Sequence, residues 1–177
     1  MKKTIVLSII YIAFLYVASP ALGGQLTVTA GKKNEKYEKV YFAGGCFWCM
    51  EESFDKVNGV IKSVSGYSGG HTENPSYEDV IYKDTGHVEA IEITYNPKVL
   101  TYEKLLNVYW KNIDPFDELG QFCDKGKSYR SVVFYKNLSQ KNIIKRSLKK
   151  IEKKFNSKVV TLVWNFEKFY PAETYHQ

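Results

Sequence analysis

Cysteine and histidine are both scarce in this chain of 177 residues, and the scarcity excludes two common kinds of protein. The sequence has three cysteines and three histidines. A secreted domain stapled by disulfide bonds normally carries a larger, even set of cysteines. A structural zinc site needs about four ligands, yet there is no second C-x-x-C, and no two of His71, His87 and His176 stand at helical spacing. No metal site is therefore predicted, and the odd cysteine count indicates at least one chemically active thiol.

The sequence also lacks internal repeats, low-complexity tracts and any linker-like stretch beyond residue 38. Residues 24–38 are polar and rich in lysine, which predicts a flexible lead-in. The remaining residues, 39–177, suit a single domain, because about 100–200 residues per domain is usual. A chain of this size can bury a core without disulfide bonds or metals.

The N-terminus is apolar but lacks the length of a comfortable membrane span. A positive start is followed by an apolar run from Thr4 to Val17 and then by small residues, which is the pattern of a secretory signal peptide. The run is shorter than the ~20 residues that cross a bilayer. We expect a signal peptide at residues 1–23, and an exported, periplasmic protein without stable membrane association after cleavage. An uncleaved membrane anchor is the alternative.

Positive charge is in excess but is concentrated in one stretch. The formal net charge is +6, and Lys2 and Lys3 would leave with the signal peptide. Much of the remainder lies in residues 141–154, a helix-like segment rich in lysine. Such a face is usually solvated surface, and export argues against a nucleic-acid partner. We therefore expect none.

Apolar periodicity predicts alternating strands and helices. We expect strands at 39–43, 60–70, 88–95, 131–136 and 158–164, and helices at 46–58, 101–113 and 138–155. This order predicts an α+β two-layer sandwich, with a mixed sheet built from βαβ units around a ferredoxin-like core. The tract at 115–130 has no period, and a loop this long is often part of an active site.

The first cysteine stands where a strand turns into a helix. Cys46 follows Gly44 and Gly45 and opens the predicted helix. A thiol in the first turn of a helix meets free N–H groups and the positive end of the helix dipole, which lower its pKa. Cys46 is thus placed as a nucleophile, and Cys49, one turn later, can reach its sulfur. On spacing alone, half of a zinc site and a pair of buried core cysteines remain alternatives.

The residues between these two cysteines are unusual for a thioredoxin-type dithiol. Phe47 and Trp48 are bulky and apolar, and no strand-helix-strand-proline pattern follows. We interpret the two rings as the wall of a small pocket beside the sulfur, with plain core packing as the alternative for Phe47.

Two further clusters carry groups capable of chemistry. Glu89 interrupts the apolar strand at 88–95, and a carboxyl that faces a core is costly unless it is paired or stays protonated. A protonated Glu89 could donate a proton at neutral pH; exposure on the polar side of the strand is the alternative. The long loop brings together Cys123, Asp124, Tyr129 and Arg130.

Six segments match a known family in order and spacing. They read GGCFWCMEESF, GYSGG, NPSYEDV, TGHVEAIEITYNP, QFCDKGKSYRS and FYPAETYHQ. Over about residues 40–177 the sequence resembles the A-type peptide methionine sulfoxide reductases. The resemblance implies reduction of the S epimer of methionine sulfoxide, free or in proteins, as repair of oxidative damage and without a bound cofactor.

The resemblance assigns the reacting groups. It implies that Cys46 attacks the sulfoxide sulfur and that Glu89 protonates the sulfoxide oxygen. Methionine is released, Cys46 becomes a sulfenic acid, and a second thiol condenses with it to a disulfide. A thioredoxin-like protein is the implied reductant, and export would require a membrane-linked relay of electrons.

It also assigns supporting groups. Tyr77 and Tyr129 match tyrosines that hydrogen-bond the sulfoxide oxygen, and Asp124 matches an aspartate that orders the site. Phe47 and Trp48 match the aromatic pocket for the methyl group of the substrate.

The resolving cysteine is either Cys49, which is local, or Cys123, which neighbours Asp124. Many relatives instead use cysteines in a C-terminal tail, whereas this sequence stops at Gln177. We expect that this protein either lacks such a tail or is a piece of a longer fusion with a B-type reductase. We also expect a monomer.

Two other functions fit part of the pattern. A general thiol–disulfide oxidoreductase would use Cys46 and Cys49 and would not need Glu89. A redox-sensing or sulfoxide-binding module would keep the site without turnover.

Overall fold

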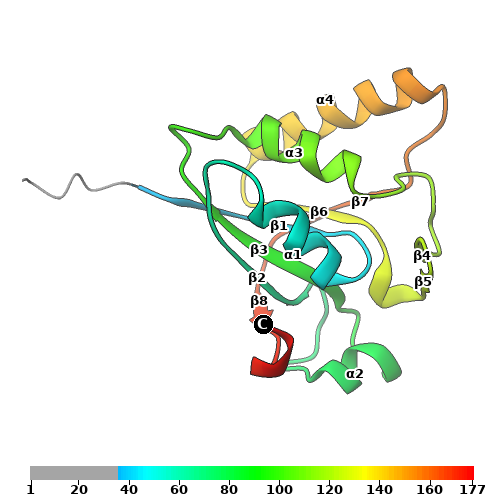
Figure 1. Cartoon of the computed structure of the whole chain (residues 1–177). Helices are drawn as coiled ribbons and strands as arrows, with labels where there is room; N and C mark the ends of the chain where they lie inside the picture. Colours follow the sequence, from blue (N-terminus) through cyan, green and yellow to red (C-terminus); the bar gives the residue numbers. More distant parts are fainter. Residues whose placement is uncertain (1–35) are drawn as a thin grey trace, which may run out of the picture. The chain divides into compact units, whose positions relative to one another are not determined.

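A computed structural model describes residues 36–177 of the chain (Figure 1). The predicted signal peptide, 1–23, and nearly all of the predicted lead-in, 24–38, lie outside the described residues and stay predictions. The last residue assigned to the lead-in, Glu38, already belongs to the first strand. Among residues 36–177, no helix has both the length and the apolar character needed to cross a bilayer.

Six strands form one mixed sheet in the order β7-β6-β1-β3-β2-β8. Neighbours are antiparallel except β6 and β7, which are parallel. The strands are β1 Glu38–Ala43, β2 Val60–Ser68, β3 Val88–Tyr95, β6 Val132–Tyr135, β7 Leu162–Asn165 and β8 Phe169–Pro171.

Three helices supply the apolar core on one face of this sheet. They are α1 Phe47–Asp55, α3 Tyr102–Lys111 and α4 Leu138–Phe155. Figure 1 shows α3 beside α4, with α1 in front of the strands. Their buried residues Phe54, Leu105 and Ile144 join one cluster with Ile91 and Ile93 of β3. Because side chains alternate along a strand, Glu89 lies on the same, helix-covered face of β3.

The order of elements explains the sheet. When the short elements between them are left out, β1, α1, β2, β3, α3 and β6 follow one another along the chain. Their strands lie in the antiparallel order β6-β1-β3-β2, in which β3 separates the two strands that α1 connects. This is the ferredoxin-like arrangement, and α4 with β7 adds a parallel βαβ unit at one edge. The predicted α+β sandwich with a mixed sheet is confirmed.

The opposite face of the sheet is covered by aromatic side chains from the C-terminal part of the chain. Tyr41 stacks on Phe166 with 3.7 Å between ring centroids. Trp164 and Phe169 pack on the same cluster, which includes Phe134 of β6. The sheet is therefore buried on both faces, by helices on one and by the aromatic side chains of Trp164, Phe166 and Phe169 on the other.

Several predicted boundaries change where local contacts replace regular structure. The helix expected at 46–58 ends at Asp55, because the chain then turns through Gly59, at φ +100°, into β2. The strand expected from residue 158 begins at Leu162, since the Val160 N–H donates to the Pro115 carbonyl rather than to a strand.

One helix was missed by the sequence patterns. It is α2, Tyr77–Tyr82, whose start is fixed by reciprocal hydrogen bonds between Ser76 and Asp79. The aperiodic tract at 115–130 contains a small hairpin, β4 Gly120–Gln121 and β5 Asp124–Lys125, followed by the 3-10 turn η1, Lys127–Tyr129. A second 3-10 turn, η2, Thr174–His176, follows β8.

The turn from β1 into α1 should tolerate no side chain at residue 45. Gly45 has a φ of +79°, and an added Cβ would lie 2.6 Å from the Cβ of Gln121. Left-handed backbone costs an alanine about 1–2 kcal/mol, and overpacking adds about 1–3 kcal/mol. Chemical denaturation of Gly45→Ala should show both costs. Gly86→Ala is the matched control, because Gly86 has a φ of +75° but more room; equal losses in the two variants would contradict the crowding.

Candidate active site

Cys46 is held at the start of α1 by contacts on both sides of the turn. It is the N-terminal capping residue of the helix and is partly buried. Before the turn, the hydroxyl of Tyr109 donates to the carbonyl of Ala43 at 2.8 Å and fixes the end of β1. Gly45 packs against Gln121 of the β4–β5 hairpin. The strand, the turn and the hairpin thus hold the thiol at one place.

The protonation of this thiol differs from the sequence-based expectation. Burial raises the pKa of Cys46 above its ordinary value, and this outweighs the backbone N–H groups of Cys49 and Trp48, which favour the thiolate. The neighbouring Cys49 thiol raises it further. The prediction of a lowered pKa considered the helix start alone and is wrong for the free protein, because desolvation is the larger effect.

Glu89 is the buried acid of the site. Its side chain is 2 % exposed, and its carboxyl accepts the backbone N–H of Phe47, the first residue of α1, at 3.0 Å. Burial raises the pKa of Glu89, the Phe47 N–H lowers it in part, and the nearby charge of Asp124 raises it, which leaves the pKa at about 7. The alternative of an exposed Glu89 is excluded, and a large fraction of the carboxyl is protonated at neutral pH.

Tyr77, Tyr129 and Asp124 come from three different elements and meet around Glu89. Tyr77 is the first residue of α2, Tyr129 ends η1, and Asp124 begins β5. Burial raises the pKa of Tyr129, as do a hydrogen bond with Tyr77 and the charges of Glu89 and Asp124. The phenol of Tyr129 therefore stays neutral and can donate a hydrogen bond.

The two aromatic residues after Cys46 have different environments. Phe47 is 1 % exposed, with its ring centroid 6.0 Å from that of Tyr67 and 6.4 Å from that of Tyr77. Trp48 is 52 % exposed, and its ring centroid lies 5.6 Å from that of Phe47. Phe47 is thus a core residue that also lines the site, while Trp48 forms an open wall.

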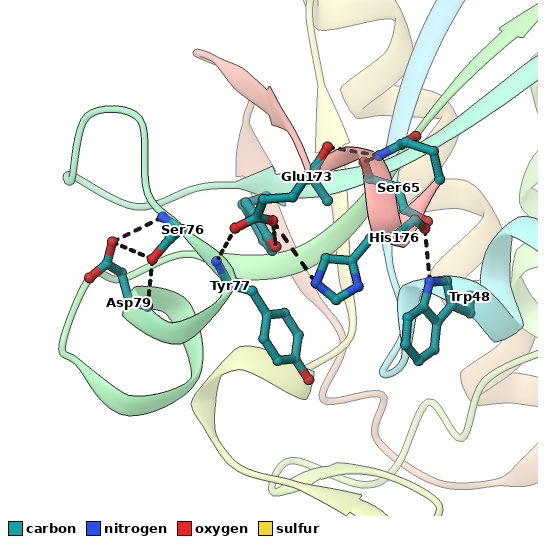
Figure 2. Close-up of polar contacts among 10 residues, drawn as sticks. Trp48, Ser65, Ser76, Tyr77, Asp79, Glu173 and His176 are labelled. Carbon is teal, nitrogen blue, oxygen red and sulfur yellow. Dashed lines mark hydrogen bonds and ion pairs between the residues drawn. The ribbon is translucent and has the colours of Figure 1, made fainter.

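The C-terminal segment, residues 169–177, completes this wall. The sequence patterns assign no role to it. Strand β8 pairs with β2, which brings η2 to the site. Figure 2 shows Glu173 and His176 of this segment beside Tyr77 and Trp48. The Trp48 indole N–H donates to the His176 carbonyl at 2.8 Å, and the His176 ring centroid lies 4.6 Å from that of Tyr77. The motif FYPAETYHQ was the only signal for this segment, and it gave no role.

All three cysteines are free thiols, and their positions differ. Cys49 lies in the first turn of α1, and its thiol interacts directly with that of Cys46. Cys123 is exposed in the turn between β4 and β5, and it is not among the groups that perturb the Cys46 thiol. No three cysteine, histidine, aspartate or glutamate side chains of residues 36–177 converge as metal ligands would.

A hollow in the described part of the chain lies away from these residues. It has a volume of about 640 Å³ and is lined among others by His71, Trp164 and Lys168. Neither Cys46 nor Glu89 lines it. The groups around Cys46 come instead from α1, η1, α2 and η2.

A sulfur nucleophile beside a neutral carboxylic acid, phenols and aromatic rings suits thiol chemistry on a small, oxygen-bearing substrate. These features define a thiol-dependent oxidoreductase. The family profile described as peptide methionine sulfoxide reductase matches residues 38–177. The chain belongs to this family, and its relatives are of the A type, MsrA.

The relatives agree in sequence and in structure. Peptide methionine sulfoxide reductase MsrA of Listeria monocytogenes serotype 4a is 52% identical over 145 residues, which are 81% of this chain and 82% of the relative. MsrA of Bacillus subtilis is 51% identical over 146 residues, with the same coverage. Reduced Mxr1 from Saccharomyces cerevisiae superposes with a TM-score of 0.76 at 29% identity, over 80% of this chain and 83% of that one. Methionine sulfoxide reductase A of Corynebacterium diphtheriae gives 0.71 at 26%, over 80% and 72%.

Replacing the buried acid should stabilise the protein at high pH. The folded state raises the pKa of Glu89 from 4.5 to about 7, so the folded state binds this proton more tightly and stability falls as pH rises from 4.5 to 7. The shift corresponds to about 3 kcal/mol. Glu89→Gln should therefore unfold at higher urea concentration than wild type at pH 8, and the gain should shrink towards pH 4.5.

Glu92→Gln is the matched control on the same strand. Glu92 accepts hydrogen bonds from Lys39 and Tyr41 on the other face of the sheet, so its replacement should give no gain at pH 8. A wild-type protein as stable as Glu89→Gln at pH 8 would show that burial of Glu89 carries no penalty.

Proposed function

We propose that the protein reduces the S epimer of methionine sulfoxide, free or in proteins, to methionine, with Cys46 as nucleophile and Glu89 as proton donor. The observation that carries this proposal is the buried Glu89, with its pKa raised to about 7, hydrogen-bonded to the start of the helix that Cys46 opens. A sulfoxide oxygen leaves only when it is protonated, and a neutral carboxyl within the site can protonate it.

In the first step the Cys46 sulfur attacks the sulfoxide sulfur while Glu89 gives its proton to the oxygen. The oxygen ends on Cys46 as a sulfenic acid, and methionine leaves as the thioether. The thiol proton replaces the one that Glu89 gave up. The sulfoxide gains two electrons and Cys46 loses two. Phenols of Tyr77 and Tyr129 stabilise the charge on the oxygen, and Phe47 and Trp48 contact the methyl group of the substrate.

In the second step Cys49 attacks the sulfenic sulfur of Cys46, which forms a disulfide and releases water. The direct interaction of the two thiols supports Cys49 over Cys123. A thioredoxin-like dithiol then reduces the disulfide. Yeast Mxr1 has also been solved in complex with Trx2, and we extend a reductant of this kind to the present chain as part of the proposal.

An epimer-resolved assay tests the reaction. The protein is incubated with dithiothreitol and each epimer of a methionine sulfoxide peptide, and the products are separated by chromatography. Only the S epimer should disappear. Cys46→Ser should abolish turnover, and Glu89→Ala should slow it by about 10²–10⁴-fold, the usual range for a lost general acid. Loss of both epimers would refute the S specificity. Reduction of insulin disulfides without sulfoxide turnover would refute the proposal in favour of a general thiol–disulfide oxidoreductase.

Peptide mapping after one turnover without reductant tests the resolving cysteine. The oxidised protein should contain a Cys46–Cys49 disulfide. Cys49→Ser should accumulate a sulfenic acid on Cys46 that a sulfenic-acid probe labels, whereas Cys123→Ser should behave as wild type. A Cys46–Cys123 disulfide would assign the resolving role to the hairpin instead.

A further inference from the structure

A carboxylate from the C-terminal segment holds two tyrosines at the edge of the site. One oxygen of Glu173 accepts the backbone N–H of Tyr77 at 2.8 Å. The other accepts the hydroxyl of Tyr67, also at 2.8 Å. Figure 2 shows Glu173 between these groups and the ring of His176, whose Nε2 is 4.0 Å from the same carboxylate. A single side chain therefore connects β2, α2 and η2.

The partners of Glu173 favour its ionised, carboxylate form. Partial burial opposes ionisation, but N–H groups of Tyr77 and of Glu173 itself, the Tyr67 hydroxyl and the nearby His176 outweigh it, so the pKa of Glu173 is lowered. Hydrogen bonds to an ionised acceptor are about twice as strong as those between neutral groups. The arrangement depends on a carboxylate rather than on any polar side chain.

Both tyrosines that Glu173 holds face the reacting groups. The side chain of Tyr77 forms a hydrogen bond with that of Tyr129. Tyr77 is also the first residue of α2, so the bond from its backbone N–H to Glu173 fixes the position of the backbone that carries the ring. Tyr67 lies directly opposite Glu89 on the neighbouring strand, and its ring packs 6.0 Å from that of Phe47. A shift of Glu173 would therefore move the phenol of Tyr77 and the wall beside the buried acid together.

The C-terminal segment has other contacts that hold it in place. The Gln177 side-chain amide donates to the carbonyls of Ser65 and Ala172, both at 3.0 Å. Strand β8 is paired with β2, and the His176 carbonyl accepts from Trp48. Glu173 is thus not required to anchor the segment, and its bonds are directed at the two tyrosines.

We propose that Glu173 is a positioning residue for the reduction of the sulfoxide, acting through Tyr77. The inference rests on the proposed function, in which the Tyr77 phenol holds the sulfoxide oxygen. That bond strengthens as charge develops on the oxygen, so misplacement of the phenol affects the chemical step more than substrate binding.

A double-mutant cycle tests this role in the full chain. Glu173→Ala removes both acceptors, and single-turnover reduction of an S-sulfoxide peptide should slow about 10–100-fold with less than about 2-fold change in substrate affinity. Glu173→Gln, which keeps one acceptor and the shape of the side chain, should lose less. Glu73→Ala is the matched control: Glu73 forms an ion pair with Lys168 at the surface. Within residues 36–177 it makes no hydrogen bond with Tyr67 or Tyr77, so this variant should react as wild type.

The second arm of the cycle is Tyr77→Phe, which removes the phenol that Glu173 is proposed to place. In this background Glu173→Ala should cost less than about 2-fold, because the two changes share one effect. An equal loss in both backgrounds, or a Glu173→Gln that folds and reacts as wild type, would overturn the inference while leaving the proposed function intact. A Tyr77→Phe variant with wild-type rate would overturn both the tyrosine assignment and the inference, whereas Cys46 and Glu89 would keep their roles.

Discussion

The hydrogen bond between the Phe47 N–H and the Glu89 carboxyl is the contact on which the site depends. It joins the first residue of α1 to β3, and so places the acid beside the helix start that carries Cys46. The N–H favours the anion, but burial prevails and leaves the pKa of Glu89 at about 7. An acid with this pKa is a proton donor and, after donating, a competent acceptor near neutral pH.

This constraint explains why so many elements meet at one point. A carboxyl 2 % exposed needs neighbours that exclude water, and α1, β2, α2 and η1 provide them with aromatic side chains. The negative charge of Asp124 disfavours a second negative charge on Glu89, which helps the acid to hold its proton. Burial likewise makes Cys46 retain its proton in the free protein. Burial therefore favours the protonated form of both the acid and the thiol before substrate arrives.

Much of the fold could be predicted because its signals are local. The amphipathic pattern gave α4 at 138–155 and the alternation gave β3 at 88–95, both with the bounds that the structure has. Helix α2 has only six residues, which are too few for a periodic signal. The sequence feature that indicates its start is the capping pair of Ser76 and Asp79. The sequence does not predict the orientation of Glu89, because its strand is apolar on both faces. The pKa of Cys46 was predicted in the wrong direction, since desolvation arises from tertiary packing and the helix start alone does not contain it.

The most direct test of the account is the titration of the Glu89 carboxyl in the free protein. With ¹³C-labelled glutamate, the carboxyl resonance of Glu89 can be assigned by its loss in Glu89→Gln and followed by NMR from acid to alkaline pH. The account predicts a midpoint near pH 7. A midpoint near the ordinary value of 4.5 would contradict it, because Glu89 would then be ionised at neutral pH and unable to protonate a sulfoxide.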